Sequence, residues 1–380
     1  MKHALLMLLA SFVYISCGYN NGRKLNETSQ VQTTSTNKND IVKLVKLKGD
    51  TIDYGNSIIS PVITALSDEH FLIRGYGENY FNVFEWDTSQ NRLVNLGGFL
   101  KKGKGPTEMI SPTVNIDKER KIIFVLDFNG NISKLIKIPY DKIEKIFNKE
   151  EWMEISFTNL VNGLYFPSFV AANDTSIIVL GSSPASNNML SIVNLSNLST
   201  KEIPYTFPNT SYEQTNSMNV LNHLVYGINA TIEKRPNGNE LLYACSHGKF
   251  AEIITVRDYE VINHINISSI IPKYTSKDNA NPVFSNDCLQ GYTVYVTSNC
   301  IYLLDLPLTK EDINKGKNYK GYPFYYSDKL LVYNWDGKLV NTYLLDAPIC
   351  TFVVDAKDNA LIGMTNDKNG DIIVKKYTLI

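Results

Sequence analysis

The side chains that could do chemistry are scattered along this chain rather than clustered. The chain has 380 residues and five histidines, of which His3 lies in an apolar N-terminal segment. The other four, His70, His223, His247 and His264, fall on different predicted elements without the spacing of metal ligands. We therefore assign no catalytic residue and no metal site, and we expect no cofactor.

Four cysteines follow the N-terminal segment, and they allow two interpretations. Cys245, Cys288, Cys300 and Cys350 include no CxxC pair, so the sequence does not predict a zinc site. Cys288 and Cys300 could form a disulfide in an oxidising compartment. We favour the alternative, in which all four are buried free thiols on strands.

Two carboxylates could support hydrolysis if they meet at a channel. Asp117 and Asp355 end predicted inner strands, and carboxylates act as general acids and bases in glycoside hydrolysis. The alternative is that these aspartates cap turns. Residues 367–371 (DKNGD) resemble half of a calcium loop, but Gly370 is misplaced and no distal Glu follows, so we expect a hairpin turn.

Tyrosine and asparagine side chains gather in long segments between predicted strands. These residue types suit carbohydrate or peptide recognition, because tyrosine offers stacking area and amides offer hydrogen bonds. The candidate ligand-binding residues are Tyr212, Asn216, His223, Tyr322, Tyr325 and Tyr326. The alternative for residues 322–326 (YPFYY) is that they pack their segment onto the rim of the protein.

The elements that must position these side chains recur along the chain. Short β-like runs come in groups of three or four that restart about every 50–60 residues, which is the period of a β-propeller blade. Asn-Gly and Asp-Gly pairs between such runs are typical of hairpin turns. The sequence therefore predicts an all-β fold, a six-bladed β-propeller. The predicted strands are, blade by blade, 62–66, 71–76, 81–86 and 93–99; 113–117, 122–127, 132–138 and 153–157; 168–172, 176–181, 190–195 and 201–205; 230–235, 240–245, 251–257 and 261–267; 292–297, 300–306, 329–334 and 339–345; 349–355, 360–365 and 372–379.

The sixth predicted blade is one strand short, and an N-terminal strand is expected to complete it. Residues 41–47 (IVKLVKL) alternate apolar and basic side chains, as a half-exposed strand does. Joining this strand to the last blade closes the ring and removes an unpaired sheet edge.

The long connections lie mostly on one side of the predicted ring. In a four-stranded blade, the loop between the second and third strands and the crossing to the next blade emerge on the same side. Residues 182–189, 206–229, 268–291 and 307–328 belong to this set and define what we call the insertion-rich side. We expect binding there, because loops on a rigid scaffold usually carry it. Residues 139–152 are predicted to form a short helix on the opposite side.

Residues 103–108 (GKGPTE) carry a resemblance to a known family. This segment follows the last strand of blade one and resembles the G-x-G-P-x-E signature of the TolB-like six-bladed propeller lipoproteins of Bacteroidetes. The resemblance implies a six-bladed propeller on a lipid anchor, and it supplies no catalytic residues. A phosphate loop is rejected, because a strand and not a helix follows. Glycine permits unusual backbone angles and proline stiffens a crossing, so we interpret four motif residues as structural. They are Gly103, Gly105, Pro106 and Glu108.

The N-terminus has the pattern of an export signal that ends in a lipid attachment site. Residues 4–13 form an apolar run too short to span a bilayer, and residues 14–17 (YISC) resemble a bacterial lipobox. The alternative is an ordinary secretory signal that happens to contain a cysteine. We predict a lipoprotein signal peptide over residues 1–16, the lipidated Cys17 and a disordered tether over residues 17–40, and the propeller over residues 41–380.

Composition and location limit the partners. The net charge is −1 at pH 7, and nucleic acid is not expected as a partner because phosphate binding needs a basic surface. We expect a lipid-anchored protein of the bacterial envelope, at the outer membrane, with the periplasmic and the surface side both left open.

The first functional hypothesis is a non-enzymatic binding or scaffolding module for a protein, peptide or glycan. The second is a propeller hydrolase or lyase for glycans or lactones, with calcium as a candidate requirement, and the third is a purely structural envelope protein.

Overall fold

A computed structural model describes residues 44–55, 60–75, 78–105, 108–129, 132–158, 168–181, 186–208, 220–276 and 281–380. The chain divides into two units, Met1–Ile41 and Val42–Ile380. The first unit lies wholly outside the described residues, and with it the predicted signal peptide, Cys17 and the predicted tether. The second unit contains every described residue.

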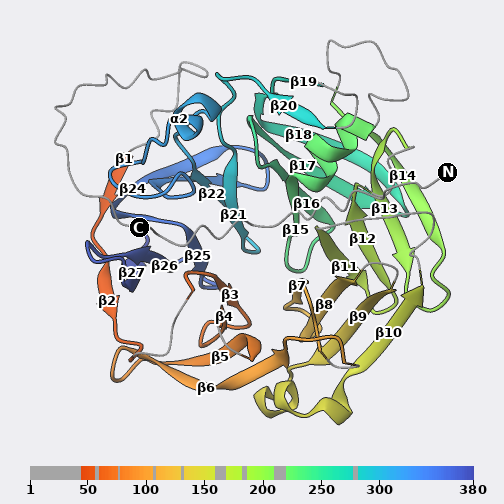
Figure 1. Ribbon diagram of the computed structural model, residues 1–380, viewed down its shortest axis with the longest axis horizontal. Coiled ribbons are helices and arrows are strands. Elements are labelled where there is room, and N and C mark those ends of the chain that lie inside the picture. Colours follow the sequence, from red (N-terminus) through yellow and green to blue (C-terminus); the bar gives the residue numbers. More distant parts are fainter. Residues whose placement is uncertain are drawn as a thin grey trace, which may run out of the picture. The chain divides into compact units, whose positions relative to one another are not determined.

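Six β-sheets form the blades of a ring around a central channel, as Figure 1 shows. Apart from the two N-terminal strands described below, the strands of each blade pair antiparallel in chain order, which confirms the predicted six-bladed propeller. The strands are β3 (Ile63–Ala65), β4 (His70–Arg74), β5 (Asn79–Asp87) and β6 (Arg92–Lys101) in blade one; β7 (Pro112–Asp117), β8 (Ile122–Asn129), β9 (Ile132–Pro139) and β10 (Met153–Thr158) in blade two; β11 (Phe169–Asn173), β12 (Ser176–Leu180), β13 (Asn188–Asn194) and β14 (Thr200–Thr206) in blade three; β15 (Ala230–Lys234), β16 (Glu240–Cys245), β17 (Lys249–Arg257) and β18 (Glu260–Ile270) in blade four; β21 (Tyr292–Val296), β22 (Cys300–Asp305), β23 (Ser327–Asn334) and β24 (Leu339–Ile349) in blade five; β25 (Thr351–Val354), β26 (Ala360–Asn366) and β27 (Ile372–Thr378) in blade six.

The core lies between neighbouring blades, and the second strand of blade two shows how the sequence builds it. Ile123 and Val125 pack against blade one, while Phe124 and Leu126 pack against blade three. All four side chains have no exposed surface. Successive strand residues point to opposite faces, so an uninterrupted apolar run is what a strand needs when both faces are covered. Burying each such side chain stabilises the fold by about 1.5–3 kcal/mol.

An N-terminal strand closes the last blade, as predicted, but the residues that do so differ from those expected. Asp50–Ile52 (β2) pairs antiparallel with β27 and completes blade six. Leu44–Leu47 (β1), within the segment predicted for that place, instead joins blade five as a fifth strand, in parallel with β24. The alternation of apolar and basic residues specifies a half-exposed edge strand, and the outer edges of both blades satisfy that requirement equally well.

Short elements occupy the longer connections. Two 3-10 helices, η1 (Ile143–Phe147) and η2 (Lys149–Glu151), lie between β9 and β10, where a short helix was predicted. A π-helical turn, η3 (His223–Ile228), precedes β15. The hairpin β19 (Tyr274–Ser276) and β20 (Pro282–Phe284) follows β18, and the helix α2 (Lys310–Asn314) follows β22.

The segment that resembles a calcium loop and the four cysteines both have structural roles. Asp367 accepts hydrogen bonds from the backbone N–H groups of Asn369 and Asp371 at 2.7 and 2.9 Å, and it thereby closes the hairpin between β26 and β27. The hairpin interpretation is therefore confirmed. The four cysteines of the described chain are free thiols, so Cys288 and Cys300 do not form a disulfide in this structure.

The link between β1 and β2 depends on a glycine. A Cβ atom at Gly49 would lie 2.7 Å from the ring of Tyr377 on β27, which is closer than carbon atoms approach. The backbone N–H of Gly49 also donates to the carboxylate of Asp346, which forms an ion pair with the ammonium of Lys375 at 2.7 Å. The closing segment therefore lies against blade six at a distance that only glycine permits.

We expect Gly49→Ala to destabilise the propeller by about 1–3 kcal/mol, the usual cost of an extra methyl group in a packed site. Thermal unfolding followed by circular dichroism measures the effect as a lower Tm. Lys48→Ala is the matched control, since Lys48 is the exposed neighbour of Gly49 in the same link and its loss should leave Tm unchanged. Equal Tm values for the two variants would contradict this account of ring closure.

Candidate functional site

The described residues of the 103–108 motif are held together by the motif's own glutamate. Glu108 Oε2 accepts a hydrogen bond from the backbone N–H of Gly105 at 2.9 Å. Gly103 has a φ angle of 152°, and a Cβ atom there would lie 2.0 Å from the same carboxylate oxygen. Pro106 lies outside the described residues. The described part of the motif connects blades one and two and does not line the channel cavity introduced below.

Two of the three predicted tyrosines between β22 and β23 fasten their segment to blade six. Tyr322 donates a hydrogen bond from its hydroxyl to the backbone carbonyl of Asn366 at 3.2 Å, and Tyr326 donates to the side-chain oxygen of the same residue. Tyr326 is buried, whereas Tyr325 is exposed beside the equally exposed Phe324. The packing interpretation thus describes Tyr322 and Tyr326, and Tyr325 is the most exposed of the three.

The predicted His223 lies buried in η3, away from solvent. Its side chain is 3% exposed, and burial lowers the pKa of His223 to about 4, so the imidazole is neutral at pH 7. The adjacent Asn222 accepts a hydrogen bond from the hydroxyl of Tyr274 on β19. Tyr212 and Asn216, the other two candidates of this crossing, lie outside the described residues.

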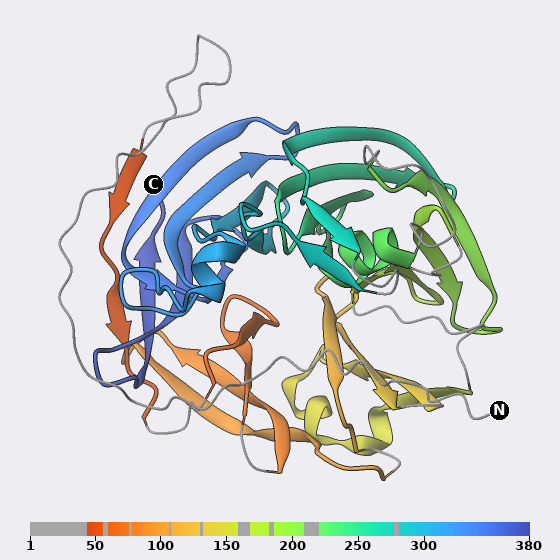
Figure 2. The same cartoon turned by 45° about the horizontal axis from the view of Figure 1, so that its top comes forward.

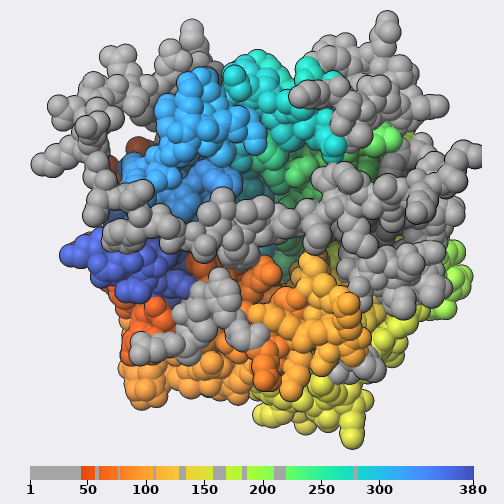
Figure 3. Space-filling view, viewed as in Figure 1, coloured from red at the N-terminus to blue at the C-terminus, as the bar shows by residue number. Residues whose placement is uncertain are grey.

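The described insertions pack on one another. The backbone N–H of Lys310 at the start of α2 donates to the carbonyl of Cys288 at 2.8 Å, and Leu289 forms a β-bridge with Thr309. Figures 1 and 2 show α2, the β19–β20 hairpin and η3 next to one another on one side of the ring. In the space-filling view of that side, the blue atoms of blade five adjoin the cyan atoms of the hairpin (Figure 3). The described part of the insertion-rich side is therefore largely a packed layer.

A cavity of about 230 Å³ occupies the central channel, and residues from the inner strand of every blade line it. It lies toward the side opposite the insertions, which we call the short-turn side, because Lys118 and Pro236 in its wall follow the last residues of β7 and β15. The channel is built by the ring as a whole, since six strands far apart in sequence each contribute a wall. One lining residue from each blade is Thr64, Lys118, Ala171, Glu233, Tyr295 and Phe352.

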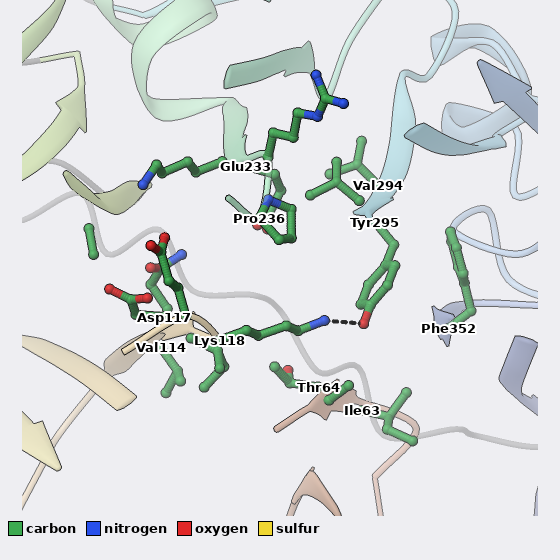
Figure 4. Close-up of a pocket in the computed structure, with 18 of the residues that line it drawn as sticks. Ile63, Thr64, Val114, Asp117, Lys118, Glu233, Pro236, Val294, Tyr295 and Phe352 are labelled. Atoms are coloured by element: carbon green, nitrogen blue, oxygen red, sulfur yellow. Dashed lines mark hydrogen bonds between the residues drawn. The ribbon is translucent and has the colours of Figure 1, made fainter. Parts of the chain in front are cut away.

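Lys118 spans this cavity from blade two to blade five. Its ammonium donates a hydrogen bond to the hydroxyl of Tyr295 and lies 4.6 Å from the centre of the tyrosine ring, as Figure 4 shows. Blades two and five stand opposite each other in a six-membered ring, so this contact crosses the channel. Within the described residues, no carboxylate forms an ion pair with Lys118, and its hydrogen-bond partner is a neutral phenol.

The carboxylates of the channel differ in how they are compensated. Asp117 forms an ion pair with Arg120, whose guanidinium also donates to the carbonyl of Ala172 at 3.0 Å. Burial raises the pKa of Glu233 to about 7, and the charge of Lys118 opposes that rise. Asp355 accepts hydrogen bonds from the backbone of its own turn and is not part of the cavity wall. The structure therefore brings Asp117 to the channel and leaves Asp355 as a turn cap.

Sequence reasoning missed Lys118, Glu233 and Tyr295 as site residues. A signal for Glu233 was present, because in residues 230–235 (ATIEKR) the buried Ile232 points into the blade and its neighbour must point the other way. No comparable signal places Lys118 against Tyr295, since 177 residues separate them.

The raised pKa of Glu233 makes stability depend on pH with a defined sign. Between the ordinary glutamate pKa of 4.5 and about 7, the unfolded chain loses the Glu233 proton while the folded protein keeps it. The contribution of Glu233 to the free energy of unfolding therefore falls as the pH rises through that window, and it is constant above it. We expect the free energy of unfolding of Glu233→Gln, relative to that of the wild type, to increase by about 2–3 kcal/mol between pH 4.5 and pH 7.5.

Urea unfolding at a series of pH values measures this difference. Glu119→Gln removes a neighbouring exposed carboxylate of the same rim and serves as the baseline. A Glu233→Gln difference that tracks the Glu119→Gln baseline at every pH would show that the pKa of Glu233 is not raised in the folded protein.

Comparisons with known proteins agree with this architecture. The family model described as TolB-like 6-blade propeller-like matches residues 77–357. A solved structure of a DUF4221 family member from Bacteroides vulgatus is similar at 12% identity and a TM-score of 0.50, covering 89% of this chain and 97% of that chain. TolB from Acinetobacter baumannii is similar at 13% identity and a TM-score of 0.42, covering 83% of this chain and 65% of that chain. No curated protein matches the chain in sequence. The matched family model spans most of the propeller, and the chain belongs to the family of TolB-like six-bladed propellers.

Proposed function

We propose that this protein is a non-enzymatic binding module of the bacterial envelope, and that its ligand enters the channel from the short-turn side. One observation carries the proposal: all six inner strands meet at a single cavity that holds an ammonium group without a carboxylate partner among the described residues. Concave sites with a few convergent polar groups on a mostly apolar wall are the usual form of ligand sites.

The rigidity of the wall supports this assignment. Every lining strand is the inner strand of a blade whose second strand is buried between neighbouring blades, so little of the cavity can collapse. Polar groups placed on such a scaffold need little ordering when a ligand arrives, which favours binding. The ligand is a protein, peptide or glycan group small enough to enter a cavity of about 230 Å³.

The channel residue Glu233 supports an enzymatic alternative. A carboxylic acid with a pKa of about 7 in a channel can exchange a proton near neutral pH, as a hydrolase or lyase of glycans or lactones requires. Asp117, which also lies in that wall, forms an ion pair with Arg120. Turnover by the wild type that disappears in Glu233→Gln would favour the enzyme, whereas ligand binding by the wild type without any turnover favours the module.

The envelope location rests on the sequence and on the family. None of the described helices is long and apolar enough to cross a membrane. We propose that the mature protein is held at the outer membrane through a lipid on Cys17, and that residues 17–40 act as the tether between lipid and propeller. Exposed Tyr325 and Phe324 on the insertion-rich side offer a second surface for a protein partner.

Filling the channel should abolish binding. We expect Thr64→Phe, on the inner strand of blade one, to lower the affinity for any channel ligand at least tenfold by occupying its space. Thr206→Phe introduces the same ring on the exposed outer strand of blade three and should bind normally. Thermal-shift screening of the full-length protein against envelope glycans and peptides, with calorimetry on the hits, measures the effect. Hits that bind both variants equally would place the ligand site elsewhere.

Removing the lipid attachment residue tests the location. We expect Cys17→Ser to move the protein from the membrane fraction to the soluble fraction, because a thioether-linked lipid cannot form on serine. Metabolic labelling with a fatty acid and mass spectrometry of the mature N-terminus provide independent readouts. An unlabelled wild-type protein with an uncapped N-terminus would identify an ordinary secretory signal instead.

A further inference from the structure

The ammonium of Lys118 is a positive charge held in a partly enclosed cavity without an ion-pair partner in the described part of the chain. Its contacts there are the hydroxyl and the ring of Tyr295, both of which are neutral. Charges removed from bulk water are ordinarily paired, because an isolated ion loses much of its hydration free energy. The group that would match Lys118 in full is an anion.

The other charged groups of the wall form no ion pair with Lys118 among the described residues: Glu119, next to it, is exposed, and Lys234 adds a second cation. Asp117 is compensated by Arg120, and the guanidinium of Arg235 is shared between Glu240 at 3.4 Å and the carbonyl of Ser298. The charge of Lys118 acts on Glu233 and favours its ionised form. Burial nevertheless raises the pKa of Glu233 to about 7, so a large share of this carboxyl group is protonated at neutral pH. In that form its carboxyl group is a hydrogen-bond donor, which also favours an anionic ligand.

The remaining polar groups of the wall are hydroxyls and amides from several blades. Thr64, Asn115 and Thr293 lie on the inner strands of blades one, two and five. The rings of Tyr295 and Phe352 stand 6.2 Å apart beside them. A sugar ring presents alternating hydroxyl and C–H surfaces, which match hydroxyl and amide groups around an aromatic wall. An apolar amino-acid side chain would leave those hydroxyl and amide groups without partners.

Resting on the binding function proposed above, we propose that the channel binds an acidic sugar, one uronic acid residue whose carboxylate pairs with Lys118. The ammonium turns from the Tyr295 hydroxyl to the carboxylate, and the freed phenol donates to a sugar oxygen. The contact between Lys118 and Tyr295 across the channel is then the ligand-free arrangement of the site, in which the phenol stands in for the missing anion.

Calorimetry with D-glucuronate and D-glucose tests this proposal on the full-length protein, since the two sugars differ in the carboxylate alone. We expect glucuronate to bind at least tenfold more tightly than glucose. Lys118→Gln should remove that preference, and Lys118→Arg should keep it because the charge is retained. Lys357→Gln is the control, as Lys357 is exposed and follows the inner strand of blade six without lining the cavity.

Tyr295→Phe provides a second readout that a structural role for Lys118 would not produce. This variant removes the hydrogen bond to the ammonium in the free protein and the hydrogen bond to the sugar in the complex, so we expect glucuronate affinity to change by less than about fivefold in either direction, since a net hydrogen bond contributes little. A tenfold loss in Tyr295→Phe would overturn the exchange of partners described above.

Three outcomes would overturn the acidic-sugar assignment, and they are separable from failure of the binding function. Equal affinity for glucuronate and glucose would remove the carboxylate from the proposal. N-acetyl-alanine binding as tightly as glucuronate would assign the site to peptide carboxylates. If a neutral or peptide ligand binds and Thr64→Phe blocks it, the channel remains the binding site and the sugar acid is refuted. If Thr64→Phe changes the binding of no ligand, the channel itself is refuted as the binding site.

Discussion

Ring closure by a short N-terminal segment is the constraint on which the rest of this structure depends. Residues 44–52 pair first with the outer strand of blade five and then, after two linking residues, with the third strand of blade six. The last blade otherwise has three strands, and its sheet would end at β27 with unpaired N–H and C=O groups. Hydrogen bonds between the two ends of the propeller domain thus hold the circle of blades together.

The channel exists because that circle is closed. The cavity belongs to no single blade, since each blade contributes one inner strand to the wall. The contact between Lys118 and Tyr295 joins blades that stand opposite each other, so its geometry depends on the number of blades and on their tilt. Burial of Glu233 follows from the same enclosure, and so does the raised pKa of its carboxyl group.

The two sides of the ring differ in the roles of their side chains. On the insertion-rich side, buried tyrosines hold long segments in place, as Tyr326 does on Asn366 and Tyr274 on Asn222. On the short-turn side the turns that follow the inner strands are brief, and polar groups of the inner strands line the cavity. A long insertion rich in tyrosine uses its aromatic surface for its own packing, whereas a short turn leaves the scaffold accessible. Length of a loop is therefore a poor guide to how accessible its side chains are in the described part of this protein.

The sequence by itself determined the local structure. Apolar runs such as residues 122–126, turn residues such as Asn369 and Gly370, and the period of the strand groups predict six blades, because each depends only on neighbours along the chain. The tertiary structure alone decided which edge β1 joins and which side chains meet in the channel. An alternating strand fits any half-exposed edge, and Lys118 and Tyr295 are brought together by the closed ring of six sheets, which no local pattern encodes.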